Sequence, residues 1–327
     1  MDGLPNSIPL QITPTIQRTL KAPIGCVGVG LHSGRRVQLR LLPAPAGSGI
    51  VFRRTDLGLD IPARFDHVVD TRLCTVLGLP GRPETRVGTV EHVMAALAGA
   101  GVHNAIVEVD GPEVPIHDGS AASALFLIDC AGTMQQPEFV PAIEILRPVR
   151  VEQGEAFAEL RPFPFAFDLA MSIAFDAAAI GRQALTLRLT PESFRAELAR
   201  ARTFTLASEI TQMRAAGLAQ GGSLENAVVV DGAKVLNPAG LRMPDEFVRH
   251  KLLDAVGDLA LAGAPLRGRF VGHRTGHTLN NRLLRALFAE DANWRLLPAT
   301  DAIARPDPSA IPAPPALARR VRERAAA

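Results

Sequence analysis

The sequence has few cysteines, few lysines and almost no net charge. Cys26, Cys74 and Cys130 are the only cysteines among 327 residues, and no two of them form a CxxC pair. So sparse a set predicts neither a disulfide framework nor a cysteine-based zinc site, and it fits a reducing compartment. The formal net charge of +2 argues against a nucleic-acid-binding role that depends on bulk charge.

Long hydrophobic segments are also missing. No stretch approaches the roughly 20 apolar residues of a transmembrane helix. The beginning of the sequence lacks the charged segment and apolar run of a signal peptide. With 47% hydrophobic and 21% charged residues, the chain has enough apolar material for a packed core. We therefore expect a soluble, cytoplasmic protein without a transmembrane segment.

The arrangement of sequence patterns predicts an α+β fold in two halves. Prolines in the first 14 residues predict an extended arm over residues 1–20. The Pro- and Gln-containing residues 135–141 predict an inter-domain linker. The Pro-, Ala- and Arg-rich residues 299–327 predict a disordered tail. The first domain then covers residues 21–134 and the second covers residues 142–298.

Residue periodicity predicts the main elements of both halves. Alternation of apolar and polar residues from 25 to 51 indicates strands. Thr89 is the predicted N-cap of a helix over 89–98, before a strand over 105–109. The remaining predictions are a helix over 120–128, strands over 149–151, 156–160, 167–173 and 185–189, a helix over 191–200, a hairpin over 227–236 and a helix over 245–262.

The helix predicted over 245–262 carries a polar stripe on an otherwise apolar surface. His250 and Asp254 are four residues apart and share one helical face, and Asp258 extends this stripe by another turn. Because an unpaired buried charge is costly, the stripe must be exposed, paired or bound to a ligand. On spacing alone, an exposed His–Asp contact is the simpler explanation.

Glu91 and His92 lie in the first turn of the helix predicted over 89–98. A glutamate in a first turn also complements the helix dipole, so the pair needs no functional explanation. Together with His250 and Asp254, however, His92 completes the usual ligand set of a catalytic zinc ion, with a carboxylate next to one ligand. The same set suits non-haem iron. Neither an HExxH motif nor the nucleobase deaminase motif occurs.

A third candidate is His277, in the segment GHRTGH at residues 272–277. The flanking glycines predict a loop that presents the histidine. Such a histidine can serve as a general acid or an electrostatic partner near neutral pH. It can equally be an ordinary surface residue.

Several long motifs resemble those of the UDP-3-O-acyl-N-acetylglucosamine deacetylases, zinc-dependent enzymes of Gram-negative bacteria. In chain order, the matching segments are GVGLHSG, TVEHVMAALAGAGVHNAIVEVDGPEVPIHDGSA, RARTF, GLAQGGSLENAVVVD, LRMPDEFVRHKLLDAVGDLALAG and GHTLNN. They span most of residues 20–290. Motifs of this length, in the family's order, are specific.

The resemblance implies a metal centre and a catalytic group around it. The implied zinc ligands are His92, His250 and Asp254, and Fe²⁺ is an alternative in the same ligand set. Glu91 resembles the general base, and His277 resembles a cation that stabilises developing charge. Asp258 would orient His277, and Thr203 would donate a hydrogen bond to the oxyanion.

The resemblance also implies contacts with an acylated UDP-amino sugar. Phe204 would line the sugar site, and Lys251 would meet a polar or phosphate part of the substrate. Phe175 is the candidate for stacking on uracil. Cys74 would lie beside the acyl passage.

The family's fold has two similar α+β domains with the metal site at their interface. Its reaction hydrolyses the acetamide of UDP-3-O-acyl-N-acetylglucosamine, releasing acetate and UDP-3-O-acyl-glucosamine, in the committed step of lipid A biosynthesis. The resemblance therefore predicts a deacetylase, which we expect to be a monomer, and the acyl chain is compatible with peripheral membrane contact. Alternatives are a non-haem iron hydrolase or oxygenase and a non-catalytic sugar-nucleotide or lipid-binding protein.

Overall fold

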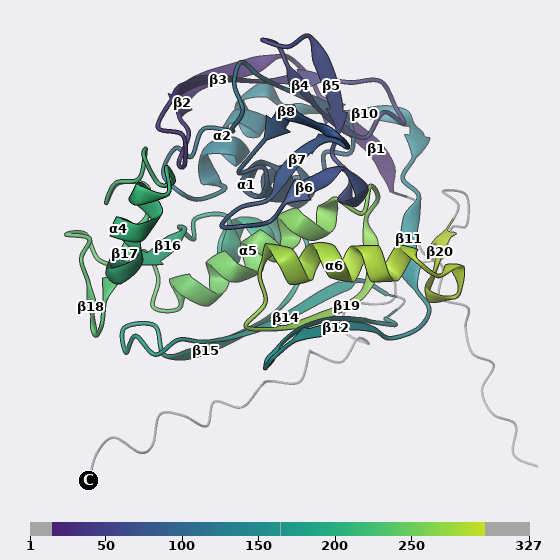
Figure 1. The fold of residues 1–327 in the computed structure, drawn as a ribbon. Helices are drawn as coiled ribbons and strands as arrows, with labels where there is room; N and C mark the ends of the chain where they lie inside the picture. Colours follow the sequence, from purple (N-terminus) through teal and green to yellow (C-terminus); the bar gives the residue numbers. More distant parts are fainter. Residues whose placement is uncertain (1–14, 164, 298–327) are drawn as a thin grey trace, which may run out of the picture.

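The computed structural model describes residues 15–163 and 165–297 and has the predicted α+β architecture (Figure 1). The predicted tail and most of the predicted N-terminal arm lie outside these residues. Figure 1 shows helices α1, α5 and α6 between a sheet of the first half and a larger sheet of the second half. The helices are α1 (Glu91–Gly99), α2 (Ala122–Ala131), α3 (Pro191–Ser193), α4 (Ala207–Ala215), α5 (Glu246–Ala260) and α6 (His277–Phe288).

The first half is built on a five-stranded sheet with the order β2-β3-β9-β4-β5. Its strands are β2 (Ile24–Val29), β3 (Arg36–Pro43), β4 (Ile50–Arg54), β5 (Leu59–Pro62) and β9 (Ala105–Val109). In β3 the buried residues are Val37, Leu39 and Leu41, so the predicted period-two alternation is confirmed. A second, three-stranded sheet contains β6 (Val68–Asp70), β7 (Val76–Leu79) and β8 (Arg82–Val87).

The second half is built on a seven-stranded sheet around the central strand β19. Its strands are β11 (Ala142–Ile145), β12 (Val149–Gln153), β13 (Ala156–Arg161), β14 (Phe167–Ala174), β15 (Arg182–Arg188), β19 (Leu266–His273) and β20 (Trp294–Leu297). The predicted hairpin over 227–236 forms β17 (Val228–Asp231) and β18 (Lys234–Val235), with β16 (Phe204–Leu206) parallel to β17. The strands predicted over 149–189 are confirmed.

The predicted arm and linker meet in a small two-stranded sheet. β1 (Ile16–Leu20) pairs antiparallel with β10 (Thr133–Phe139). These strands include the end of the predicted arm and most of the predicted linker, so part of the linker is regular structure. The proposed domain limits themselves stay predictions.

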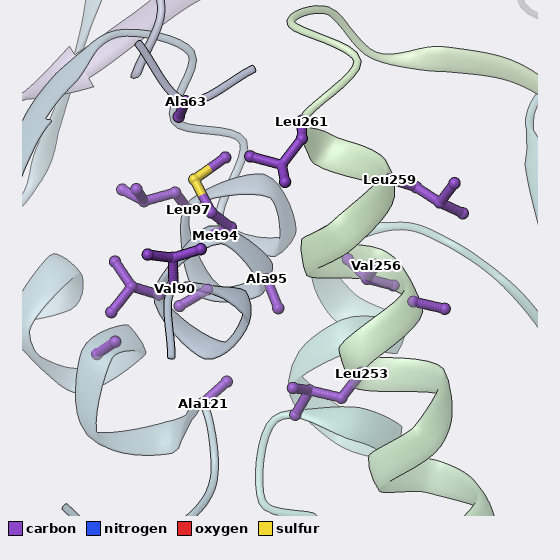
Figure 2. Packing of buried hydrophobic residues seen from close by; sticks show 14 of the residues in the cluster. Ala63, Val90, Met94, Ala95, Leu97, Ala121, Leu253, Val256, Leu259 and Leu261 are labelled. Atoms are coloured by element: carbon purple, nitrogen blue, oxygen red, sulfur yellow. The ribbon is translucent and has the colours of Figure 1, made fainter. Parts of the chain in front are cut away.

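Helices α1 and α5 cross at a position where only a glycine fits. A Cβ atom on Gly257 of α5 would lie 2.0 Å from the carbonyl oxygen of Glu91 in α1. Beside this crossing, Leu253 and Leu261 extend toward the residues of α1 in Figure 2. Both leucines are fully buried, which makes the crossing part of the hydrophobic core. The first turn of α1 and the C-terminal part of α5 are thereby held at contact distance.

Two sequence-based predictions about helix starts are wrong. Thr89 does not cap α1, because it has a left-handed φ of 58° and its hydroxyl donates to Glu113 Oε1 at 3.1 Å. His277 is not a loop residue, because it is the first residue of α6. The glycines around His277 obscured an apolar helical pattern made by Leu279, Leu283, Leu284 and Leu287.

The other helix predictions differ mainly in their limits. The helix predicted over 120–128 runs from Ala122 to Ala131. The segment predicted as a helix over 191–200 consists of the short α3 and a π-helical turn at Phe194–Leu198. The helix α4 was not predicted, and its exposed, weakly patterned surface explains why. Among the described residues, no helix combines the length and the apolar character needed to cross a membrane.

We predict that Gly257→Ala destabilises the protein. An alanine in an unobstructed helix stabilises by roughly 0.4–1 kcal/mol relative to glycine. Here the methyl group would push α5 away from the backbone of Glu91, and overpacking of this kind costs about 1–3 kcal/mol. Urea unfolding followed by circular dichroism measures the difference. A variant as stable as the parent protein would show that the two helices are not in close contact.

Candidate metal centre and active site

A cleft of about 330 Å³ lies where α1, α5, α6 and β16 meet. It draws residues from both halves of the chain. The sequence-predicted site residues that line it are Cys74, Glu91, His92, Phe175, Thr203, Phe204, His250, Lys251, Asp254 and His277. Asp258 lies behind this lining, in contact with His277. The structure therefore brings together residues that are separated by up to about two hundred positions in the sequence.

His92, His250 and Asp254 form a compact group of three potential metal ligands. Their donor atoms all lie within 4.8 Å of one another, and all three residues are buried. Asp254 Oδ1 is 3.3 Å from His250 Nε2 and 3.6 Å from His92 Nε2. Tetrahedral zinc with bonds of about 2.0–2.1 Å places its donor atoms roughly 3.3 Å apart. The spacing therefore fits one metal ion shared by the three side chains.

The hydrogen bonds around the group leave His250 Nε2 and Asp254 Oδ1 available to bind a metal ion. The Nδ1 atom of His250 donates to the carbonyl oxygen of Ala201 at 3.0 Å, which leaves Nε2 as the free donor atom. Lys251 Nζ donates to Asp254 Oδ2 at 2.9 Å. Asp254 Oδ1 is buried and has no hydrogen-bond partner among the described residues. A buried carboxylate oxygen without a partner is costly, and a metal ion would satisfy it.

The protonation states also suit metal binding. Burial lowers the pKa of His250 to about 4, so its imidazole is neutral at physiological pH. Burial raises the pKa of Asp254. Nearby His250 and Lys251 more than offset this effect and hold the pKa well below the ordinary value of an aspartate. A neutral imidazole and an ionised carboxylate are the forms that bind metals.

Glu91 and His277 face each other beside this group. Glu91 is the first residue of α1, and its Oε1 atom lies 4.0 Å from Nε2 of His277. The Nδ1 atom of His277 donates to Asp258 Oδ2 at 2.9 Å. Burial raises the pKa of Glu91. Burial alone would lower the pKa of His277, but Asp258 and Glu91 outweigh it and raise the pKa to about 9, so the imidazole is a cation at neutral pH.

The remaining predicted residues form the walls of the cleft. Thr203 precedes β16. Its backbone N–H donates to the carbonyl oxygen of Gly119, and its carbonyl oxygen accepts from the N–H of Val228, at 2.8 Å each. The Phe204 ring packs edge-on against Phe175, with centroids 5.5 Å apart, and lies 6.3 Å from the His250 ring. Burial raises the pKa of the Cys74 thiol, so Cys74 contributes a neutral side chain to the wall.

His32 is a cleft residue that was not predicted from the sequence. Both of its ring nitrogens are buried and have no hydrogen-bond partner among the described residues. The backbone N–H groups of His32 and Ser33 donate to the two oxygens of Glu113, at 2.7 and 2.8 Å, which fixes the loop. The motif GLHSG contained the signal, but spacing alone gave His32 no chemical role.

Comparisons with known proteins give one consistent result. Residues 17–289 match the family described as UDP-3-O-acyl N-acetylglycosamine deacetylase (LpxC). The chain is 50% identical over 285 residues to the UDP-3-O-acyl-N-acetylglucosamine deacetylase of Acidithiobacillus ferrooxidans, covering 86% of this chain and 92% of that protein. It is 47% identical to the enzyme of that name from Shewanella frigidimarina, with the same coverage. The relative from Anaeromyxobacter dehalogenans is 49% identical, over 87% of this chain and 91% of that protein.

We predict that the protein binds about one divalent metal ion per chain through the three-residue group. His250→Ala removes one donor and should leave most chains without metal after dialysis against a weak chelator. His32→Ala is the matched control, since it removes a buried cleft imidazole that lies outside the group. Metal content measured by inductively coupled plasma mass spectrometry checks both. Full metal content in His250→Ala would contradict the assignment.

Proposed function

Because this chain belongs to the UDP-3-O-acyl-N-acetylglucosamine deacetylase family, we propose that it hydrolyses the acetamide of UDP-3-O-acyl-N-acetylglucosamine. The products are acetate and UDP-3-O-acyl-glucosamine, and the reaction is the committed step of lipid A biosynthesis. The observation that carries the proposal is the juxtaposition of a three-donor metal group with Glu91 and the cationic His277 in one cleft. This combination supplies a base, an acid and a Lewis-acid site for amide hydrolysis.

The metal in this proposal is zinc, held by His92, His250 and Asp254. Two imidazoles and one carboxylate are typical of catalytic zinc with an open position, although Fe²⁺ also fits this set. When bound, zinc lowers the pKa of a coordinated water toward about 7 and polarises a carbonyl group. The donor spacing and the unpartnered oxygen of Asp254 support this assignment.

Glu91 acts as the general base in the proposed mechanism. One oxygen, Oε2, accepts a hydrogen bond from the backbone N–H of Thr75 at 3.0 Å, which leaves Oε1 directed at the cleft. Oε1 can therefore take the proton of the attacking water. Burial raises the pKa of Glu91 above that of an ordinary glutamate, which makes the carboxylate a stronger base.

His277 provides positive charge and a proton. Because Asp258 accepts the hydrogen bond from Nδ1, the other nitrogen, Nε2, faces the cleft with its proton. From there it can stabilise the negative charge that develops on the carbonyl oxygen and protonate the leaving amine. The hydroxyl of Thr203 is the proposed second donor to that oxygen, and one such donor is worth about 3 kcal/mol.

The walls of the cleft suit the rest of the substrate. The packed rings of Phe204 and Phe175 offer apolar surface for the sugar and for uracil. Lys251 reaches the cleft while its ammonium group bonds Asp254, so it can meet a polar substrate group next to the metal. Cys74 and the exposed Leu73 line the side that we assign to the acyl chain.

We also propose a cytoplasmic location. Cys26, Cys74 and Cys130 are all free thiols, as is usual in a reducing compartment. The acyl chain of the substrate would bring the enzyme to the membrane surface without anchoring it there.

Acetate release from UDP-3-O-acyl-N-acetylglucosamine tests the function directly. We expect turnover by the metal-loaded protein and a kcat that is about 10²–10⁴ times lower in Glu91→Gln, because general base catalysis contributes that much. Metal content should stay the same, since the ligands are untouched. Undiminished turnover in Glu91→Gln would remove Glu91 as the base. No turnover by fully loaded wild-type protein, over several acyl lengths, would favour a binding protein.

We predict that Asp258 and His277 act as one unit. His277→Ala and Asp258→Asn should each lower kcat strongly, while the double variant should be little worse than His277→Ala, because residues that act together are not additive. Steady-state kinetics of the four proteins measures this coupling. Additive losses would mean that Asp258 acts independently of His277.

A further inference from the structure

Every polar group of Thr75 forms a hydrogen bond with Glu91, with the residue before Glu91 or with Asp258. It lies between β6 and β7, is only 1% exposed and does not line the cleft. Its N–H donates to Glu91 Oε2 at 3.0 Å, and its carbonyl accepts from the N–H of Val90 at 3.3 Å. Its hydroxyl donates to Asp258 Oδ1 at 2.5 Å. A single residue thus joins the first turn of α1 to the last turn of α5.

On the Glu91 side, these bonds decide which carboxylate oxygen is free. The N–H of Thr75 holds Oε2, so Oε1 is the oxygen that faces His277 Nε2 at 4.0 Å. The reciprocal bond from Val90 to the Thr75 carbonyl fixes the backbone just before Glu91. The orientation of the carboxylate therefore depends on Thr75.

On the Asp258 side, the hydroxyl prevents rotation of the carboxylate. Oδ2 of Asp258 accepts from His277 Nδ1 at 2.9 Å and from Asn280 Nδ2 at 2.8 Å. Oδ1 has the Thr75 hydroxyl as its partner. The terminal torsion of an aspartate is soft, so a carboxylate bonded through only one oxygen can turn. The hydroxyl thus keeps Oδ2 pointed at His277.

We propose that Thr75 is a positioning residue that sets Glu91 and His277 opposite each other by holding the carboxylates of two helices. Its role in turnover rests on the proposed function. Its role in geometry does not, since it concerns only the orientation of side chains within the folded protein. The competing explanation is that Thr75 merely satisfies buried polar groups and so contributes to stability.

The substitution Thr75→Val separates the two explanations, because valine keeps the shape and the backbone groups and loses only the hydroxyl. We expect kcat to fall by about 10–100-fold, as small misplacements of catalytic groups do. KM and metal content should be unchanged. Thr75→Ser restores a hydroxyl and should recover most of the lost turnover.

Thr85→Val is the matched control. Thr85 is fully buried in β8, in the three-stranded sheet that also contains β6 and β7. Its hydroxyl donates to the Arg82 carbonyl at 2.7 Å and accepts from the Leu79 N–H at 2.8 Å. Its loss removes comparable buried hydrogen bonds without touching the cleft, so stability should fall while kcat is unchanged. Equal stability losses in both variants, with parental kcat in Thr75→Val, would overturn the proposal.

The route through His277 is tested in a second background. If the Thr75 hydroxyl acts through Asp258 on His277, then adding Thr75→Val to His277→Ala should change kcat by less than about twofold. A further loss as large as that seen in the parent protein would overturn this route.

Nuclear magnetic resonance tests the orientation of the His277 ring without any need for turnover. We expect ¹⁵N–¹H spectra of the imidazoles to show shifted or broadened His277 ring signals in Thr75→Val and unchanged signals in Thr85→Val. Unchanged His277 signals in both would overturn the positioning role. If the wild-type protein releases no acetate, the proposed function fails, and the spectra still decide whether Thr75 orients His277.

Discussion

The close crossing of α1 and α5 is the constraint on which the site depends. Because residue 257 is a glycine, the backbone of Glu91 can lie against α5. Helix α1 contributes the potential metal ligand His92 and the proposed base Glu91. Helix α5 contributes the potential ligands His250 and Asp254, and also Asp258. A wider crossing would leave the donor atoms too far apart to share one ion. The leucines beside the crossing tie this spacing to the hydrophobic core of both halves.

The cleft concentrates ionisable groups in a buried setting, and nearly every group has a partner. Lys251 bonds Asp254, His277 bonds Asp258, and Glu91 accepts from Thr75. Such pairing is what makes buried charges tolerable, and it fixes the groups before substrate arrives. Among the described residues of the cleft, Asp254 Oδ1 and the two ring nitrogens of His32 are buried without a hydrogen bond. The proposed metal ion would satisfy the oxygen of Asp254.

Local sequence patterns predicted much of the fold and part of the site. The helix around His250 and Asp254 was predicted to within two residues, because its apolar pattern and its flanking Pro244 and Gly263 agree. The spacing of His250 and Asp254 also predicted their shared face. Spacing alone could not show that this face is buried, since burial depends on α1 packing against it. The family resemblance, and not the periodicity, supplied the roles of Thr203 and Phe175.

Other features depend on contacts between distant parts of the chain. Thr75 and Asp258 are bonded across 183 positions, and no local pattern predicts such a contact. Thr89 has the sequence signature of a helix cap, but Glu113 binds its hydroxyl and the backbone adopts a left-handed conformation. At His277 the glycines predicted a loop, whereas the apolar stripe of α6 decides the structure. Tertiary contacts outweigh local preference at each of these positions.

X-ray absorption spectroscopy of the zinc-loaded protein tests directly whether His92, His250 and Asp254 hold the metal ion. We expect a first shell of nitrogen and oxygen at about 2.0–2.1 Å, with outer-shell scattering from two imidazoles and no sulfur. A sulfur scatterer at about 2.3 Å would contradict it, because it would mean that a cysteine and not the group on α1 and α5 holds the metal.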